Sequence, residues 1–280
     1  MRIGLVRVDG KMPNLALMKL SSWHKKRGDE VFLVDLSGLN LDRVYASQVF
    51  AGGPGFDLKS ALPDDIEHMM PDYELFKTDY SMGFTSRGCN RNCKFCIVRE
   101  KEGPIREHAW FEEFLAHEKV IIMDNNFLAS PRWKKKLEYL IARKVKVNFN
   151  SGIDLRLVTE ENACLLSKVR YYDWKFRARR LHVAWDRMED EKEIFRGLEI
   201  LTMYVPKRHI FCYVLVGFNT TIKQDLYRIL KLLEFGVTPF VMIYNNKPGP
   251  VLHRLARWIN QRYYQVVDWE KFGVVDGRKT

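Results

Sequence analysis

The chain has 280 residues, of which 46% are hydrophobic and 29% are charged. This composition is typical of a globular protein with a substantial core, either one large domain or one medium domain with a small appendage, and it argues against disorder. Charges interrupt the first apolar run too early for a secretory signal, and no apolar stretch approaches the roughly 20 residues that span a bilayer. We therefore expect a soluble, cytoplasmic protein that does not bind membranes.

The formal net charge of +11 is unevenly distributed. Residues 1–78 carry 10 Lys and Arg against 11 Asp and Glu, whereas residues 79–280 carry 36 against 24. Residues 131–180 alone hold 14 basic and 5 acidic residues. This excess predicts a polyanionic partner such as RNA or DNA. Exposed faces of helices are also often rich in Lys and Arg, so an ordinary solvated surface remains the alternative.

The N-terminal segment reads as a small α/β module. Residues 2–8 predict a strand, 13–27 a helix with Pro13 near its start, and 31–35 a second strand. A third strand is expected at 44–50, followed by the glycine-rich stretch 51–55. We expect residues 1–78 to form this abbreviated module.

From Tyr80 onward, strands and helices alternate. Six parallel strands with intervening helices indicate a (β/α) barrel or an open doubly wound sheet, and either places the functional site at the carboxyl ends of the strands. The predicted core domain spans 79–265, with a C-terminal tail at 266–280. The expected strands are 81–85, 119–124, 145–150, 180–185, 209–216 and 238–244, and the expected helices are 107–117, 131–143, 159–168, 189–203, 221–235 and 250–263.

Three of the five cysteines, Cys89, Cys93 and Cys96, follow the first of these strands with C-x3-C-x2-C spacing. Such a cluster predicts metal rather than disulfides. A cubane iron-sulfur cluster normally takes four thiolates, so three close ligands would leave one iron open to a small molecule. A zinc site completed by His108 or His117 is the alternative. Cys164 and Cys212 lie in apolar segments and are expected to be core thiols.

The pattern C-x3-C-x-Phe-C at the head of six βα units resembles the radical S-adenosylmethionine (SAM) superfamily over about residues 80–250. The resemblance implies a partial (β/α)6 barrel in which Cys89, Cys93 and Cys96 hold a 4Fe-4S cluster. It further implies that the amino and carboxylate groups of SAM chelate the fourth iron. Phe95 matches the aromatic position before the third cysteine, although simple loop packing would also explain it.

Three further segments resemble the SAM-binding segments of that superfamily. Met123-Asp-Asn-Asn-Phe127 resembles the one that receives the SAM amino group, and Asn148 to Arg156 resembles the one that faces the ribose and carboxylate. Tyr213 to Thr221 resembles the glycine-rich turn over the adenine. Each segment also has a simpler interpretation. The first would be an ordinary turn, the second a helix cap with an ion pair, and the third a turn that needs glycine. The residues implied to contact SAM are Asp124, Asn125, Asn126, Asn150, Asp154, Arg156 and Gly217.

The N-terminal module resembles a truncated cobalamin-binding α/β domain, but Asp9 to Asn14 contains no histidine to ligate cobalt. Cobalamin use is therefore not expected. The sequence also has no second cysteine triplet, which disfavours sulfur insertion and peptide chemistry that depends on auxiliary clusters.

The resemblance implies reductive cleavage of SAM to a 5′-deoxyadenosyl radical, which abstracts hydrogen from a substrate. It also implies a low-potential electron donor of the flavodoxin or ferredoxin type. His182, Trp185 and Asp186, at the end of the fourth strand, are expected at the cavity mouth as substrate contacts, although His182 alone also fits a core histidine. The basic, aromatic stretch from Trp133 to Arg180 suits a nucleic-acid substrate. The sequence leaves three other functions open: a non-catalytic nucleic-acid-binding module with a structural metal, a SAM-dependent group transferase, and an activase that installs a glycyl radical.

Overall fold

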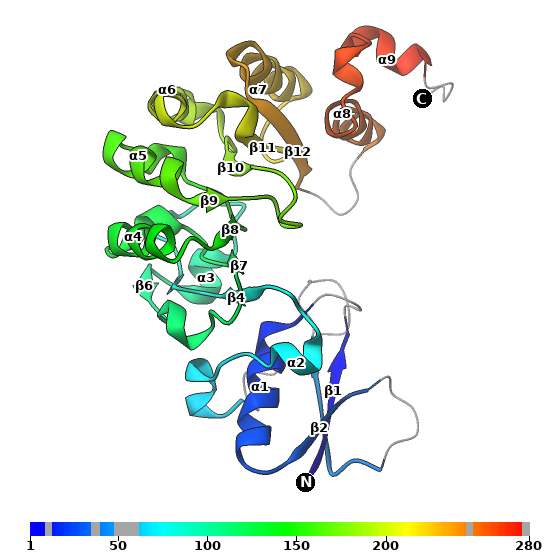
Figure 1. Ribbon diagram of the computed structural model, residues 1–280. Coiled ribbons are helices and arrows are strands. Elements are labelled where there is room, and N and C mark those ends of the chain that lie inside the picture. The colour runs from blue at the N-terminus through cyan, green and yellow to red at the C-terminus, as the bar shows by residue number, and fades with distance from the viewer. Residues whose placement is uncertain (9–12, 35–39, 48–61, 245–248, 276–280) are drawn as a thin grey trace. The chain divides into compact units, whose positions relative to one another are not determined.

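The computed structural model describes residues 1–8, 13–34, 40–47, 62–244 and 249–275 (Figure 1). The chain forms two compact units. Unit 1 comprises Met1–Thr85 and His108–Met123, and unit 2 comprises Ser86–Glu107 and Asp124–Thr280. The boundaries expected after residues 78 and 265 stay predictions. Residues 9–12, the strand ends at Asp35 and Phe50, and the stretch 51–55 lie outside the described residues.

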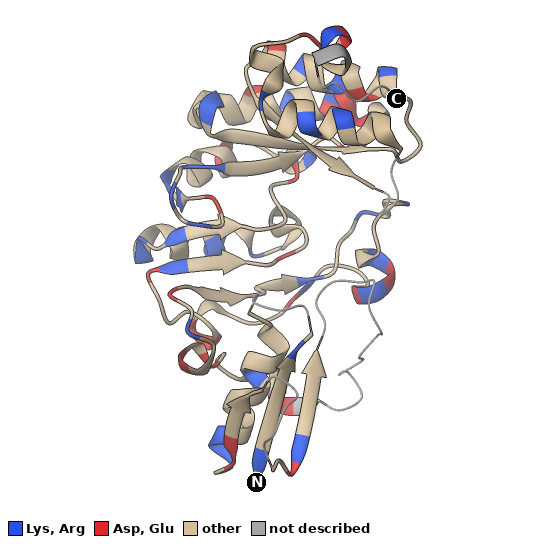
Figure 2. Cartoon of the chain, turned by 90° about the vertical axis from the view of Figure 1, so that its right-hand side faces the viewer, with Lys and Arg blue, Asp and Glu red and all other residues tan. Residues whose placement is uncertain are grey.

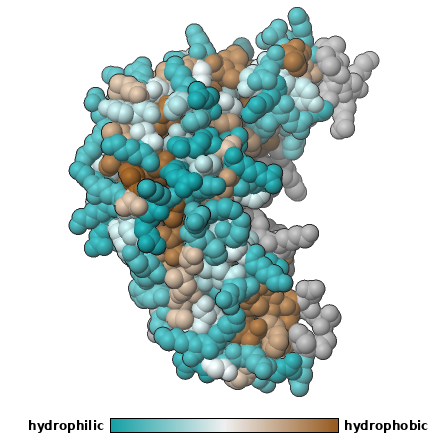
Figure 3. Space-filling view, in the orientation of Figure 1, coloured by the Kyte–Doolittle hydropathy of each residue, from teal (hydrophilic) through white to brown (hydrophobic). Residues whose placement is uncertain are grey.

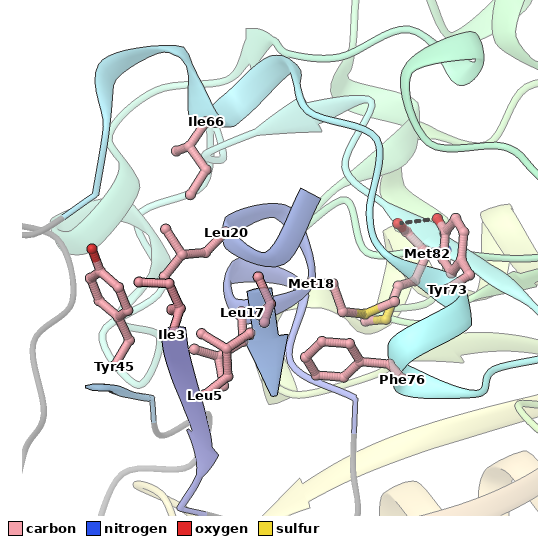
Figure 4. Close-up of a cluster of buried hydrophobic side chains, with 11 residues drawn as sticks. Ile3, Leu5, Leu17, Met18, Leu20, Tyr45, Ile66, Tyr73, Phe76 and Met82 are labelled. Atoms are coloured by element: carbon pink, nitrogen blue, oxygen red, sulfur yellow. Dashed lines mark hydrogen bonds between the residues drawn. The ribbon is translucent and has the colours of Figure 1, made fainter. Parts of the chain in front are cut away.

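Unit 1 contains a parallel three-stranded sheet in the order β2-β1-β3. Helix α1 begins after Asn14, whose side-chain oxygen accepts hydrogen bonds from the backbone of Ala16 and Leu17. The apolar residues of β1 and α1 meet in a buried cluster that includes Ile3 and Leu17 (Figure 4). Strands β4 and β7 form a second parallel pair. The elements of unit 1 are β1 (Arg2–Arg7), α1 (Leu15–Lys26), β2 (Glu30–Leu33), β3 (Arg43–Ser47), α2 (Tyr73–Phe76), β4 (Ser81–Gly83) and β7 (Lys119–Ile122).

Unit 2 contains the parallel sheet β10-β11-β12, the parallel pair β8–β9 and a short antiparallel pair β5–β6. A parallel bridge between Ile153 and Val183 links the segment after β8 to β10. The elements of unit 2 are β5 (Ser86–Arg87), α3 (Val98–Glu102), β6 (Arg106–Glu107), α4 (Trp133–Arg143), β8 (Lys146–Phe149), α5 (Glu160–Lys168), β9 (Arg170–Tyr171), β10 (Leu181–Ala184), α6 (Glu191–Tyr204), β11 (Ile210–Val216), α7 (Ile222–Phe235), β12 (Thr238–Ile243), α8 (Pro250–Asn260) and α9 (Trp269–Val275).

Strand β11 has two faces of different character. Cys212, Val214 and Val216 are completely buried, and helix α7 packs on β11 and β12. The intervening residues, Phe211 among them, are only half-buried. Because successive side chains of a strand point to opposite faces, one face of this sheet forms core and the other is open.

The helix expected at 107–117 is wrong. The segment instead contains β6, at its start, and the 3₁₀ turn Phe111–Glu113. The Ser81 hydroxyl accepts hydrogen bonds from the backbone N–H groups of Ala116 and His117, so these groups do not continue a helix. The region 266–280, expected as a tail, contains α9, whose Phe272 is buried.

Within the described ranges, no helix is long and apolar enough to cross a membrane. Hydrophilic residues cover most of the face seen in Figure 3. Lys and Arg are scattered over the helices and loops of unit 2 rather than gathered in one block (Figure 2). Apolar side chains are exposed at several separate places, which is ordinary for a protein surface.

Candidate functional site around the cysteine loop

Cys89, Cys93 and Cys96 line a single cavity of ≈ 320 Å³ in unit 2. The remaining walls come from segments that follow β8 and β10, including Gly152–Asp154 and Asp186–Arg187. Cys89 and Cys93 are half-buried and Cys96 is exposed. The predicted position of the loop, at the carboxyl ends of parallel strands, agrees with this arrangement. The volume of the cavity lies at the lower end of the range for small-molecule sites.

The Glu102 carboxylate, at the end of α3, holds the cysteine loop in shape. It accepts hydrogen bonds from Arg87 at 2.8 and 2.9 Å, from the Gly88 N–H at 3.0 Å, and from Asn125 Nδ2 at 2.8 Å. Burial disfavours the charged carboxylate, but these donors outweigh burial and lower the pKa of Glu102. One charged side chain thus joins both ends of the cysteine loop to the turn after β7.

The three polar residues after β7 take different positions. Asn125 and Asn126 line the cavity. Asp124 does not, because it is buried beneath the turn, where it accepts a hydrogen bond from Ser86 Oγ at 2.6 Å and lies 3.9 Å from Lys136 Nζ. The structure therefore gives Asp124 a supporting position and brings the two asparagines to the cavity.

Asn126 links two walls of the cavity. Its Nδ2 donates to Asp154 Oδ2 at 3.0 Å and lies 3.7 Å from Cys89 Sγ. Its Oδ1 is buried and has no hydrogen-bond partner among the described residues. A buried acceptor without a partner costs free energy, so this atom suits a ligand that brings an N–H donor.

Asp154 and Arg156 form a half-buried ion network. Arg156 donates from Nε to Asp154 Oδ1 at 2.7 Å and from Nη1 to Asp190 Oδ2 at 2.9 Å. Arg91, inside the cysteine loop, lies 3.4 Å from Asp154. Burial opposes ionisation of Asp154, but Arg156 and Arg91 outweigh it and lower the pKa of this carboxyl. Burial raises the pKa of the Cys93 thiol, against the opposing charges of Arg156 and Arg187.

A second cavity of ≈ 310 Å³ adjoins the first, and Phe95, Asp186 and Arg187 line both. Burial raises the pKa of Asp186 to about 6, even though the Arg228 charge acts in the opposite direction. Phe95 contacts Phe218 edge to face, with ring centroids 5.6 Å apart. Asp186 and Phe95 are therefore the predicted residues best placed between the two cavities.

Four other predicted residues do not line either cavity. Asn150 is exposed, and Gly217 has a φ of +78°, a conformation that favours glycine in a turn. Trp185, expected at the cavity mouth, is fully buried and donates from Nε1 to the Arg187 carbonyl at 2.8 Å. His182 is half-buried and stacks on Tyr213.

Sequence reasoning missed Glu102, Arg91, Arg187 and Asp190. The first two lie within or just after the cysteine loop, and the last two in the charged run that follows β10. Arg91 could have been predicted, because it is a charged residue inside a loop of predicted ligands. The role of Glu102 depends on the short hairpin β5–β6. Each strand of this hairpin has only two residues, so no pattern in the sequence predicts it.

The three thiols of the cysteine loop line the cavity together. Among the residues that the structure describes, no group of three or more His, Cys, Asp or Glu side chains is arranged to hold one metal ion. His108 pairs with Glu67, and His117 contacts Ser81, both within unit 1. The thiolates of a cubane bind different irons and need not converge on one point. Three thiols and the Asn126 oxygen that has no hydrogen-bond partner among the described residues thus line the same cavity.

Comparison with known proteins gives no family assignment. No protein-family model matches the chain, and no curated protein matches it significantly.

Proposed function

We propose that this chain is a radical SAM enzyme in which Cys89, Cys93 and Cys96 hold a 4Fe-4S cluster. The observation that carries the proposal is that these thiols share one cavity with Asn126, Asp154 and Arg156. When bound, such a cluster with SAM on its open iron supplies the electron that cleaves SAM to a 5′-deoxyadenosyl radical. The partial (β/α)6 barrel belongs to the same proposal, supported by the parallel strands β8–β9 and β10-β11-β12.

The residues around the cavity have separate proposed roles. Asn126 Oδ1 accepts a hydrogen bond from the amino group of SAM, since it is a buried acceptor without a partner among the described residues, on a side chain that lines the cavity. Arg156 attracts the SAM carboxylate while Asp154 and Asp190 hold its guanidinium in place. Phe95 covers the cluster side of the cavity and reduces water access.

The proposed partners follow from charge. Cys96 is exposed, and so are Lys94, Arg99 and Lys101 of the same segment. A low-potential electron donor of the flavodoxin or ferredoxin type with an acidic surface would be steered to this basic rim. The excess of Lys and Arg in residues 79–280 supports a nucleic-acid substrate. A cytoplasmic location is part of this proposal.

Anaerobic reconstitution tests the cluster. We expect about four irons with acid-labile sulfide per chain, as a cubane cluster requires, and formation of 5′-deoxyadenosine when dithionite and SAM are added. Changing Cys89, Cys93 or Cys96 to Ala should abolish both the cluster and the product.

Cys164→Ala is the matched control, because Cys164 lies on α5 and does not line the cavity. This variant should retain the cluster and the product. About one zinc per chain without SAM binding would refute the enzyme and favour a structural metal site. A full cluster that forms no 5′-deoxyadenosine would refute the radical chemistry.

A further inference from the structure

The open face of the β10-β11-β12 sheet carries aromatic side chains. Residues in register on neighbouring strands share a face, so Tyr213 and Phe240 lie side by side, and Phe211 lies beside His182. On the edge strand β12 and just beyond it, Phe240, Met242 and Tyr244 are 40%, 46% and 47% exposed. Large apolar side chains that share an exposed face indicate a binding surface.

The rings on this face form a chain of contacts. His182 stacks on Tyr213 with centroids 5.1 Å apart and an interplanar angle of 13°. Tyr213 meets Phe240 edge to face at 5.8 Å. Burial and the nearby Arg180 lower the pKa of His182 to about 4, so its ring is neutral near pH 7. These rings are uncharged, and Phe240 is the exposed one among them.

The face continues to the cysteine loop. Beyond the carboxyl end of β12, Tyr244 contacts Phe218 with centroids 4.7 Å apart. Phe218 in turn contacts Phe95, which lines the cavity of the cysteines. The aromatic face is therefore continuous with the candidate site, and a strand of this length spans about 20 Å.

Cations lie at the other end of the face. The Arg180 guanidinium lies 3.7 Å from the Phe211 ring centroid. Within the described chain Arg180 forms no ion pair, and its buried Nε has no hydrogen-bond partner. The Arg179 guanidinium next to it lies 4.0 Å from the Tyr171 ring. Two arginines with donors to spare, beside stacked rings, complement an anion attached to flat aromatic groups.

We propose that this face binds a single-stranded segment of RNA, with bases stacked on the exposed rings of Phe240 and Tyr244 and a phosphate held by Arg180. Stacking on aromatic side chains and arginine is how proteins recognise unpaired nucleotides. RNA commonly presents such nucleotides in loops and ends, whereas duplex DNA does not. The role of the bound RNA as substrate rests on the proposed function, because Phe95 connects the face to the cluster cavity.

The test measures fluorescence anisotropy of a fluorescein-labelled oligouridylate of about ten nucleotides, titrated with the full-length protein. We expect Phe240→Ala to weaken binding about 10-fold, as loss of one stacked base does. Tyr204→Ala, which removes an exposed aromatic ring from α6, should leave binding unchanged. Phe240→Tyr should keep wild-type affinity, because it keeps a ring on this face, and equal unfolding midpoints of Phe240→Ala and wild type exclude a folding defect.

The charge contribution has its own readout. Arg180→Ala should make the slope of log affinity against log salt concentration shallower by about 1, which is the change expected when one phosphate contact is lost. Lys192→Ala, an exposed cation on α6, should not change that slope.

Several results would overturn the proposal. One is equal affinity of the Phe240→Ala and Tyr204→Ala variants for the oligouridylate. Another is that oligothymidylate DNA or duplex RNA binds as tightly as the oligouridylate. A third is that the protein is a dimer in solution and that Phe240→Ala disrupts this dimer. Cys89→Ala separates the two proposals, because it removes the cluster but should bind the oligouridylate normally. Absence of 5′-deoxyadenosine with intact, Phe240-dependent binding would refute the enzyme and leave the RNA surface standing.

Discussion

Ionisation of Asp186 should make the stability of the protein depend on pH below neutrality. The folded pKa of Asp186 is about 6 against an ordinary value of 3.8, because burial disfavours the charged form. Between these values the folded protein holds a proton that the unfolded chain has lost, so stability falls as pH rises through this window. The difference corresponds to about 3 kcal/mol.

We therefore expect Asp186→Asn to remove this loss and to raise stability at neutral pH by about 2–3 kcal/mol. Urea unfolding of both proteins from about pH 4 to about pH 7 measures the effect. Glu189→Gln, at an exposed carboxylate in the same loop, is the control and should show no such gain. Parallel pH profiles for wild type and Asp186→Asn would contradict the assignment.

At the scale of single residues, motif spacing located the cysteines, and the structure places them in one cavity with Phe95, Asn125, Asn126, Asp154 and Arg156. It did not distinguish Asp124 from its two neighbours. Which side chain of a turn faces a cavity depends on partners distant in sequence, here Ser86 and Lys136. Trp185 was misplaced for a similar reason, since alternation along β10 turns it toward the helices, where it contacts Phe195. Cys212 is buried as predicted, whereas Cys164 is half-buried.

At the scale of elements, long periodic segments were predicted well. The expected helices at 131–143, 159–168, 189–203 and 221–235 correspond to α4, α5, α6 and α7 within two residues at each end. Their hydrophobic periodicity and caps, such as Thr221 before α7, are local properties of the sequence. The short elements α3, β5, β6 and β9 were missed, because two to five residues carry no periodic pattern.

The contact between α6 and the 3₁₀ turn Leu155–Leu157 gives a test at this scale. A Cβ at Gly197 would lie 2.2 Å from the Leu155 carbonyl oxygen. Alanine normally favours a helix interior by about 1 kcal/mol over glycine, but here the clash reverses the sign. We expect Gly197→Ala to destabilise the protein by about 1–3 kcal/mol and to weaken the proposed SAM binding by displacing Arg156.

Thermal unfolding and SAM titration of the reconstituted protein measure these effects. Gly249→Ala is the matched control, because a Cβ there meets no atom within 4 Å. It should change stability by less than about 1 kcal/mol. Unchanged stability of Gly197→Ala would show that α6 and the turn separate without cost.

At the scale of the whole molecule, the sequence predicted mixed α/β structure with parallel strands but not the discontinuous composition of unit 1. Segment His108–Met123 belongs to unit 1 although the cysteine loop precedes it. Its Phe111 and Phe114 are buried, and the Tyr73 hydroxyl donates to the Phe114 carbonyl. Local sequence patterns do not predict which distant segments of a chain pack together.

Removing residues 1–78 should therefore expose this segment. We expect a 79–280 fragment to exchange the amide hydrogens of residues 108–123 rapidly, while β10, β11 and β12 stay protected as in the full chain. Hydrogen exchange followed by mass spectrometry measures both regions. Equal protection of residues 108–123 in the fragment and the full chain would mean that they do not depend on residues 1–78.

The interleaved order of the two units also constrains events on the ribosome. Unit 1 lacks part of its chain until Met123 has been synthesised, and by then all three cysteines of the loop have already been made. Synthesis proceeds at about 5–20 residues per second, and domains usually fold as they emerge. The nascent chain thus carries the three thiols of the cysteine loop before its first unit can close, so the proposed cluster could be delivered while translation is still under way.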